Sequence, residues 1–256
     1  MYTHQDLNTM TKNEILYNVG LTDKVYSDQK DIDFKAQRLK LIKWIEDKKS
    51  DTQGFVATKD NTIYIVWRGS SSKKDFQNDA SIDKVPFVEE GEKVHIGFKT
   101  CWDAVKDDTY KALDIALKNL GQEHSIDNIV VCGHSLGAAI STLCAYEIYS
   151  IYKSNKIICC TIGSPRVGNK KFKENFDKSP IESLRIVNNL DIVTRTPNIG
   201  YHHVNTELRI DSEGKVKKWM IDWQRVGEYL KAVFTGNTAK DHMTNNYISA
   251  LNKWNP

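Results

Sequence analysis

Long apolar runs, clustered prolines and a strong charge of one sign are all absent from this sequence of 256 residues. No stretch approaches the roughly 20 apolar residues that a transmembrane helix requires, so we expect no membrane-spanning segment. The five prolines are scattered and no repeat or linker divides the chain, which predicts a single domain over residues 1–256. The 36 Lys and Arg nearly balance the 33 Asp and Glu, which argues against a nucleic-acid partner because such domains carry clustered basic charge.

Cysteine is also scarce, and its arrangement is a poor disulfide framework. The chain has five cysteines, an odd number, and two of them, Cys159 and Cys160, are adjacent. The first residues lack the basic and apolar regions of a signal peptide. Both features favour a reduced, cytoplasmic protein, whereas a chain trimmed of a leader would look the same and would then be secreted. The hydrophobic (40%) and charged (27%) fractions are those of a globular protein and exclude general disorder.

Strand-like and helix-like patterns alternate through the middle of the chain. Short continuous apolar runs are typical of buried strands, and longer amphipathic segments are typical of helices. The strand-like runs lie at 128–132, 157–162 and 184–187, and the helix-like segments at 98–120, 136–152 and 169–176. This alternation predicts an α/β fold with a mostly parallel central sheet and helices on both faces.

The two ends of the chain carry other patterns. Apolar residues at three- and four-residue spacing over 35–48 predict an amphipathic helix, so we expect an N-terminal helical segment over about residues 1–50. Pairs of β-rich runs predict two hairpins, which would add antiparallel strands at the sheet edges. The paired runs are 54–58 with 62–67 and 206–210 with 215–220, and two more helices are expected at 226–233 and 243–254.

The sequence G-x-S-x-G occupies residues 133–137, between a predicted buried strand and a predicted helix. In that setting the serine adopts a strained turn conformation that exposes its hydroxyl above the sheet, and the glycines leave room for the turn. The helix N-terminus supplies partial positive charge and free N–H groups where an oxyanion would form. Ser135 is therefore the candidate nucleophile.

A serine hydroxyl is a weak nucleophile and needs a base, which in turn needs an acid to hold it. The histidines after Ser135 are His202, His203 and His242. Spacing favours His242, at a predicted helix start, and leaves His203 as the alternative. Asp191 follows a predicted strand, at the sheet edge where open α/β sheets bind ligands, and is the preferred acid. The other acids considered, with weaker settings, are Asp177, Asp211 and Asp222.

Several motifs together resemble the class 3 lipases, the fungal-lipase-like branch of the α/β-hydrolases. The resemblance extends over about residues 54–250, and its motifs stand in the order of that family. They are the segments 65–70, 94–98, 133–139, 163–168, 191–197, 201–203 and 241–247. One departure is Ala138, where many relatives carry glycine. Another is the set of cysteines, which does not supply the disulfides of secreted fungal relatives.

The resemblance implies the α/β-hydrolase fold and a role for each matching residue. Catalytic roles fall to Ser135 as nucleophile, Asp191 as acid and His242 as base, which leaves His203 outside the triad. Two oxyanion-hole donors are implied, Ser70 and Leu136. Asp79 and His134 are expected to support these groups without reacting. The chemistry requires no cofactor and no metal, and the sequence contains no H-E-x-x-H motif.

The segment after Ser70, about residues 71–84, matches the position of a short lid over the active site. Its charged residues outnumber its apolar ones, so its amphipathic character is weak. The expected activity is that of a lipase, which hydrolyses acylglycerols through an acyl-enzyme at a lipid–water interface. The alternative is a carboxylesterase, including the feruloyl type, that acts on short or soluble esters. A third hypothesis is a lipase-like protein that binds without catalysis.

Overall fold

A seven-stranded sheet organises the chain in the computed structural model, which describes residues 10–70, 83–121, 128–153, 156–188, 191–204, 206–216 and 241–256. The strand order is β1-β2-β3-β6-β7-β8-β9, and a separate two-stranded sheet pairs β4 with β5. The strands of the large sheet are β1 Lys40–Asp47, β2 Thr52–Lys59, β3 Thr62–Trp67, β6 Asn128–His134, β7 Ile157–Ile162, β8 Glu182–Asn188 and β9 Thr206–Ile210. The small sheet consists of β4 Lys84–Pro86 and β5 Lys93–His95.

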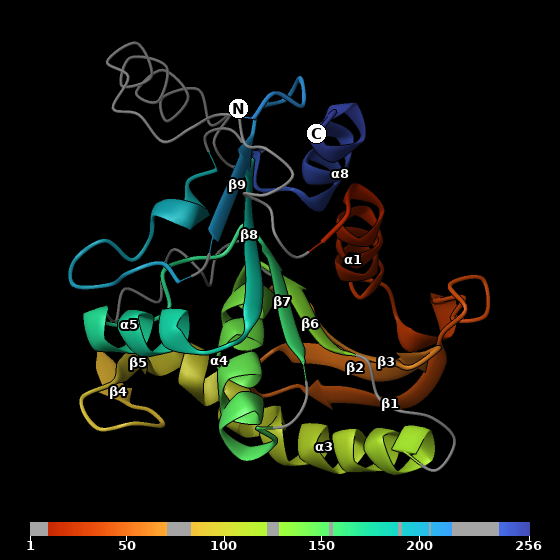
Figure 1. Ribbon diagram of the computed structural model, residues 1–256, viewed down its shortest axis with the longest axis horizontal. Helices are drawn as coiled ribbons and strands as arrows, with labels where there is room; N and C mark the ends of the chain where they lie inside the picture. Colours follow the sequence, from red (N-terminus) through yellow and green to blue (C-terminus); the bar gives the residue numbers. More distant parts are fainter. Residues whose placement is uncertain are drawn as a thin grey trace.

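Helices pack on both faces of the large sheet (Figure 1). They are α1 Lys12–Lys24, α3 Ile96–Gly121, α4 Leu136–Ile151, α5 Lys170–Lys178 and α8 Thr244–Lys253, with short 3-10 turns at Gln29–Asp31 and Val193–Arg195. The core on one face includes side chains from α3, α4 and α5, and the core on the other includes side chains from α1 and α8. Adjacent strand residues divide between the two cores, as Trp67 and Val66 do, because side chains alternate along a strand.

The direction of the strands brings several loops to one edge of the sheet. Strands β3, β6, β7, β8 and β9 are parallel, while β1 and β2 are antiparallel to their neighbours. Because the carboxyl ends of parallel strands meet at the same edge, the segments after β3, β6, β7 and β8 are neighbours there. The ladder continues past the strand ends, where the N–H of Ser135 donates to Ile162 O at 3.0 Å. This edge is the place to look for a site.

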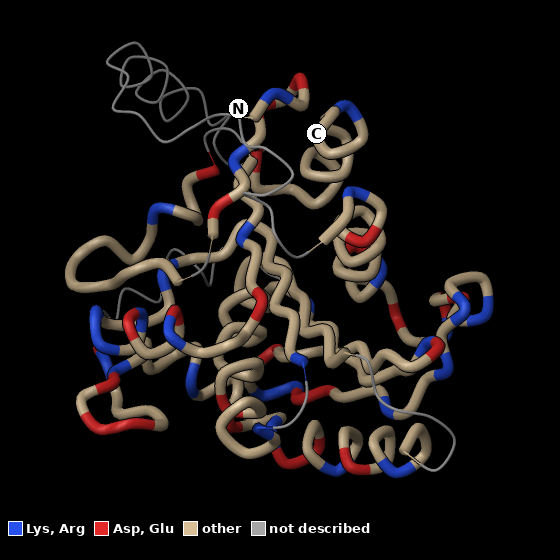
Figure 2. The backbone as a smooth tube through the Cα atoms, viewed as in Figure 1, with Lys and Arg blue, Asp and Glu red and all other residues tan. Residues whose placement is uncertain are grey.

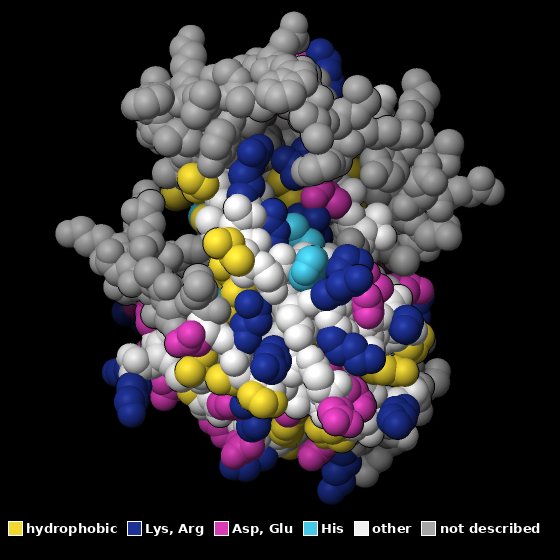
Figure 3. Space-filling view, turned by 90° about the vertical axis from the view of Figure 1, so that its left-hand side faces the viewer, with side chains coloured by type: hydrophobic (Ala, Val, Ile, Leu, Met, Phe, Trp, Pro, Cys, Tyr) yellow, Lys and Arg dark blue, Asp and Glu magenta, His cyan; other side chains and the backbone are white. Residues whose placement is uncertain are grey.

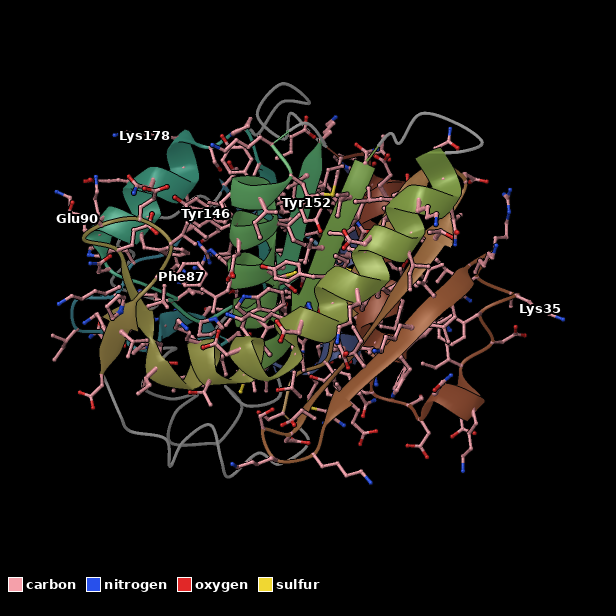
Figure 4. All side chains as sticks on the ribbon, turned by 90° about the horizontal axis from the view of Figure 1, so that it is seen from below. Lys35, Phe87, Glu90, Tyr146, Tyr152 and Lys178 are labelled. Atoms are coloured by element: carbon pink, nitrogen blue, oxygen red, sulfur yellow. The ribbon has the colours of Figure 1, made fainter. Side chains whose placement is uncertain are left out.

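An aromatic cluster joins the small sheet and α5 to α4. Phe87, after β4, stacks on Tyr146 of α4 with ring centroids 6.3 Å apart, and Tyr146 stacks in turn on Phe176 of α5 at 5.7 Å. Figure 4 shows Phe87 and Tyr146 between these elements. Buried aromatic pairs of this kind stabilise by about 0.5–1.5 kcal/mol beyond their burial, so the cluster fixes the flank of the sheet.

Charge lies mainly on the outer elements. Lys, Arg, Asp and Glu alternate along α3 and α5, and few lie on the central strands (Figure 2). On the face shown in Figure 3, hydrophobic side chains form separate patches among charges of both signs, with histidine side chains exposed between them. Among the described helices, none combines the length and the apolarity needed to cross a membrane.

The structure confirms the mostly parallel sheet, the early hairpin, and the strands and helices predicted between residues 98 and 187. The helix predicted over 243–254 is α8. The small β4–β5 sheet was not predicted, and the late hairpin is described only to a bridge between Ile210 and Val216. Residues 71–82 of the predicted lid and the helix predicted at 226–233 lie outside the described residues.

The helix predicted over 35–48 is wrong, because residues 40–47 form strand β1. The N-terminal segment is therefore helical only in part, over α1 and a 3-10 turn. The cause is a bulge, where the pairing with β2 shifts register between Leu41 and Lys43. Leu41 and Trp44 consequently pack on one core and Ile42 and Ile45 on the other. Residues that face the same core are therefore three apart at the bulge instead of two apart, and this spacing resembles that of an amphipathic helix.

Candidate active site

Ser135 lies at the turn between β6 and α4 in a strained backbone conformation. Its φ is 58° and its ψ is −123°, a region that non-glycine residues rarely adopt and that costs on the order of 1–3 kcal/mol. The residue is the N-cap of α4, and its carbonyl accepts from the N–H groups of Ala138 and Ala139. The strand-to-helix elbow that the sequence predicts is therefore present, with Ser135 at its apex.

The two glycines of the motif are required by close backbone contacts. A Cβ on Gly133 would lie 2.4 Å from Gly137 O, and a Cβ on Gly137 would lie 2.3 Å from Trp67 O. Real Cβ atoms do not approach backbone atoms this closely. The start of α4 thus packs directly against the ends of β6 and β3, and this contact fixes the position of the serine.

His242 connects Ser135 to Asp191. His242 Nε2 lies 2.7 Å from Ser135 Oγ, and His242 Nδ1 lies 2.8 Å from Asp191 Oδ2. A carboxylate only accepts hydrogen bonds, so Nδ1 carries the proton and Nε2 accepts from the serine hydroxyl. The three residues predicted as a triad are therefore in hydrogen-bond contact, although they are far apart in the sequence.

Asp191 is fully buried, and the surrounding donors fix its orientation. Besides the bond from His242, Oδ2 accepts from the Tyr247 hydroxyl at 2.6 Å and Oδ1 from the Val193 N–H at 2.9 Å. The amide of Asn188 donates to Asp241 O at 3.0 Å and so ties the end of β8 to the residue before His242. A buried carboxylate requires such partners, and their number here leaves it little freedom to rotate.

The loop after β3 runs alongside Ser135. A Cβ on Gly69 would lie 3.0 Å from Ser135 Cβ, so Ser70 follows at the edge of the candidate site. Arg68 anchors this loop through a 2.6 Å ion pair with Asp51. Leu136 is the first residue of α4, and N–H groups in a first helical turn have no partner within the helix. Asp79 lies outside the described residues.

His134 is buried directly beneath the histidine of the triad. Its Nδ1 lies 2.7 Å from the Tyr26 hydroxyl and its Nε2 lies 2.7 Å from His242 O. Burial, with a further contribution from His242, lowers the pKa of His134 well below its usual value, so it is neutral. His134 is thus hydrogen-bonded to the backbone of His242.

The other two histidines after Ser135 form hydrogen bonds to backbone carbonyls of neighbouring segments. His203 Nε2 donates to Thr194 O at 2.6 Å, and burial together with Arg185 lowers the pKa of His203 to about 3. The N–H of His202 donates to Gly168 O at 2.8 Å. Of the alternatives that spacing left open, the structure therefore places His242, and not His203, against Ser135.

Sequence reasoning assigned no role to Tyr26 or Tyr247. Tyr247 follows His242 by five residues and is fully buried in α8, so the available signal was an aromatic residue in the predicted helix just after the base. Tyr26 had no comparable signal, because it precedes Gly69 by 43 residues and His134 by 108 residues. Within the described part of the chain, no group of three or more His, Cys, Asp or Glu side chains could hold a metal ion.

Comparisons with known proteins agree with this geometry. The chain is 32% identical over 194 residues to phospholipase A1-II 1 from Oryza sativa, and the aligned region covers 64% of this chain and 49% of the relative. It is 33% identical over 183 residues to a lipase from Rhizomucor miehei, and that aligned region covers 68% of this chain and 49% of the relative. The chain therefore spans about half the length of the curated relatives it matches.

A solved triacylglycerol lipase, described as having a serine protease triad as its catalytic centre, superposes with a TM-score of 0.71. The two chains are 30% identical, and the match covers 81% of each. The predicted α/β-hydrolase fold is thereby confirmed. Residues 64–201, more than half of the chain, match the family model for lipase (class 3). The protein belongs to the class 3 lipase family.

Proposed function

We propose that this protein is a carboxylic ester hydrolase, a lipase that cleaves acylglycerols through an acyl-enzyme on Ser135. The observation that carries the proposal is the continuous hydrogen-bond chain from Ser135 Oγ through both nitrogens of His242 to Asp191 Oδ2. A serine at a strained elbow, a base in contact with it and a buried acid behind the base are the three parts that acyl transfer requires.

In the first half of the reaction His242 takes the proton of Ser135 as the hydroxyl oxygen attacks the ester carbonyl. Asp191 holds Nδ1–H and stabilises the imidazolium that forms. In this proposal the N–H of Leu136, together with the N–H and hydroxyl of Ser70, binds the developing oxyanion. His242 then protonates the leaving alcohol, and the acyl group stays on Ser135.

In the second half, water takes the place of the alcohol. His242 removes a proton from the water, which attacks the acyl-enzyme through a second oxyanion in the same hole. The carboxylic acid leaves as the proton returns to Ser135. Only Ser135 and His242 change their protonation state in this scheme, and the 2.7 Å separation of Ser135 Oγ and His242 Nε2 allows that proton transfer.

The relatives support a glycerol ester as the substrate. The Rhizomucor miehei relative is a lipase, the superposed structure is a triacylglycerol lipase, and the Oryza sativa relative is a phospholipase A1. All three names denote hydrolysis of a fatty acyl ester. The substrate panel that tests the proposal is therefore emulsified trioleoylglycerol, phosphatidylcholine vesicles, and soluble p-nitrophenyl butyrate, the last of which represents the esterase alternative.

The test compares the unmodified protein with Ser135→Ala on this panel. We expect turnover to fall by roughly 10⁶-fold, because removal of the nucleophile eliminates the acyl-enzyme route. Ser150→Ala is the matched control, since Ser150 lies near the far end of the same helix and its hydroxyl donates only to Glu147 O among the described contacts. Undiminished turnover by Ser135→Ala would refute the mechanism. If the protein hydrolysed p-nitrophenyl butyrate but neither glycerol ester, the esterase alternative would hold and the lipase proposal would be wrong.

A further inference from the structure

A single chain of hydrogen bonds crosses the floor of the candidate site. The N–H of Gly69 meets Tyr26 Oη at 3.1 Å, Tyr26 Oη meets His134 Nδ1 at 2.7 Å, and His134 Nε2 meets His242 O at 2.7 Å. Its first member precedes the oxyanion residue Ser70, and its last is the backbone of the base. We propose that Tyr26 is a positioning residue that, through His134, holds the oxyanion loop and His242 at a fixed separation; the inference rests on the proposed ester hydrolysis.

The donor and acceptor of each bond follow from the groups at the two ends. A backbone N–H can only donate, so Tyr26 Oη accepts from Gly69. A backbone carbonyl can only accept, so His134 Nε2 donates to His242 O. A neutral imidazole carries one N–H, which leaves Nδ1 as an acceptor for the Tyr26 hydroxyl proton. Each of the three hydrogen bonds therefore has one possible donor. Reversing any of them would bring two donors or two acceptors together.

The surroundings keep the chain in this state. Burial lowers the pKa of His134, and desolvation of the Tyr26 hydroxyl raises the pKa of that group although part of the residue is exposed, so neither changes its charge near neutral pH. The His134 ring also lies 4.5 Å from the His242 ring, which holds the two imidazoles in a tilted stack. A protonated His134 would present Nδ1–H to the tyrosine and break the chain, which its burial prevents.

The contact at Gly69 indicates that Tyr26 positions the loop through its hydroxyl rather than through its ring. The residue is 37% exposed, so its ring contributes less packing than a core aromatic residue would. Its oxygen, by contrast, lies so close to Gly69 that a Cβ there would come within 2.3 Å of it. The hydroxyl therefore sets both the distance and the direction of the peptide before Ser70.

Loss of the hydroxyl should affect the transition state more than substrate binding. Tyr26→Phe leaves the Gly69 N–H and His134 Nδ1 unpaired, while the ring and the triad side chains remain. An oxyanion donor misplaced by a fraction of an ångström stabilises the developing charge less, and small displacements in active sites cost up to about 10²-fold. We expect kcat on p-nitrophenyl butyrate to fall roughly 10- to 100-fold with KM changed by less than about 2-fold.

A double-mutant cycle with Ser70→Ala separates positioning from general damage. If Tyr26 acts by placing Ser70, its substitution should cost less in the Ser70→Ala background than in the unmodified protein, because coupled residues are not additive and only the N–H of residue 70 is left to be placed. Tyr17→Phe is the matched control, since its hydroxyl donates to Gln37 O at 3.0 Å in the same N-terminal part of the chain. Equal factors in both backgrounds, or a rise in KM alone, would overturn the proposal.

A spectroscopic readout makes the inference testable without turnover. In ¹⁵N-histidine spectra of the unmodified protein, His134 should show a protonated Nε2 and an unprotonated Nδ1 that accepts a hydrogen bond. Tyr26→Phe should shift the Nδ1 signal and leave the Nε2 bond to His242 in place, whereas an unchanged Nδ1 signal contradicts the chain. If the unmodified protein gave the expected spectra but hydrolysed none of the ester substrates, the proposed function would be refuted and the hydrogen-bond chain would stand.

Discussion

The two sides of Ser135 are held in place by different forces. On the nucleophile side, the position depends on backbone atoms in van der Waals contact, where the first turn of α4 meets the ends of β6 and β3. On the side of the base, it depends on polar side chains that bridge long stretches of sequence. The bond from His242 to Asp191 spans 51 residues, and the bond from His134 to His242 O spans 108.

This difference determines how each side responds to change. Backbone contacts in a close-packed interior cannot be compressed, so an added atom forces a whole element to move. A network of hydrogen bonds loses its partners one at a time, and each loss costs about 1–3 kcal/mol when the remaining group is buried. We therefore expect large, cooperative effects from substitutions at the elbow and graded effects at the base.

The largest effect is expected from Gly137→Ala, which tests the steric side. Its Cβ would lie 2.3 Å from Trp67 O and 2.6 Å from Arg68 O, so α4 has to move away from β3. We expect the free energy of unfolding to fall by about 3 kcal/mol, measured by urea denaturation, as for other overpacked interiors. Gly20→Ala, in α1 with nothing within 4 Å of its Cβ, is the control and should stabilise by up to about 1 kcal/mol. Equal stability of the two variants would contradict a sterically fixed elbow.

A smaller effect, confined to low pH, is expected at the loop that carries the acid. His203 holds Thr194 O, and the Thr194 hydroxyl holds Asp191 O at 2.8 Å. Because the pKa of His203 is about 3 in the folded protein and about 6.5 when unfolded, only the unfolded chain binds a proton between these values. The stabilisation from neutral His203 is therefore complete above pH 6.5 and is lost as the pH falls toward 3.

His203→Gln measures this contribution, since the glutamine amide can still donate to Thr194 O. Between pH 7 and pH 5 the unmodified protein should lose about 2 kcal/mol more of its free energy of unfolding than the variant does. His134, buried and neutral, acts in the same direction in both proteins and cancels in the difference. His202→Gln, in the same loop, is the control. Parallel pH profiles for His203→Gln and the unmodified protein would show that acid does not act on this loop through His203.

The same contrast explains what the sequence could predict. The elbow is local, so a strand, G-x-S-x-G and a small-residue helix were sufficient to predict Ser135 and its setting. The base was assigned by resemblance, because spacing alone left His203 open, and Tyr26 could not be found since its partners are brought to it only by the fold. The helix predicted over 35–48 failed for a related reason, since the bulge in β1 exists only through pairing with β2.

The smallest effect is expected from Tyr247→Phe, which removes one bond from the polar side and leaves the rest. The Tyr247 hydroxyl donates to Asp191 Oδ2 at 2.6 Å in a fully buried position, beside the bond from His242. Without it Asp191 keeps two donors but is less firmly oriented, so we expect kcat/KM to fall about 10-fold, which corresponds to about 1.4 kcal/mol.

Tyr152→Phe is the matched control for Tyr247→Phe, because its hydroxyl also donates to an aspartate, Asp114 Oδ1, at 2.6 Å. Tyr152, labelled in Figure 4, is the C-cap of α4, whereas Ser135 is its N-cap. The 16-residue helix therefore separates the two by roughly 24 Å. Loss of an equivalent bond there should leave kcat/KM unchanged. If Tyr247→Phe reduced activity as severely as loss of Asp191 itself, the polar side would be all-or-none like the elbow, and the contrast between the two sides of Ser135 would fail.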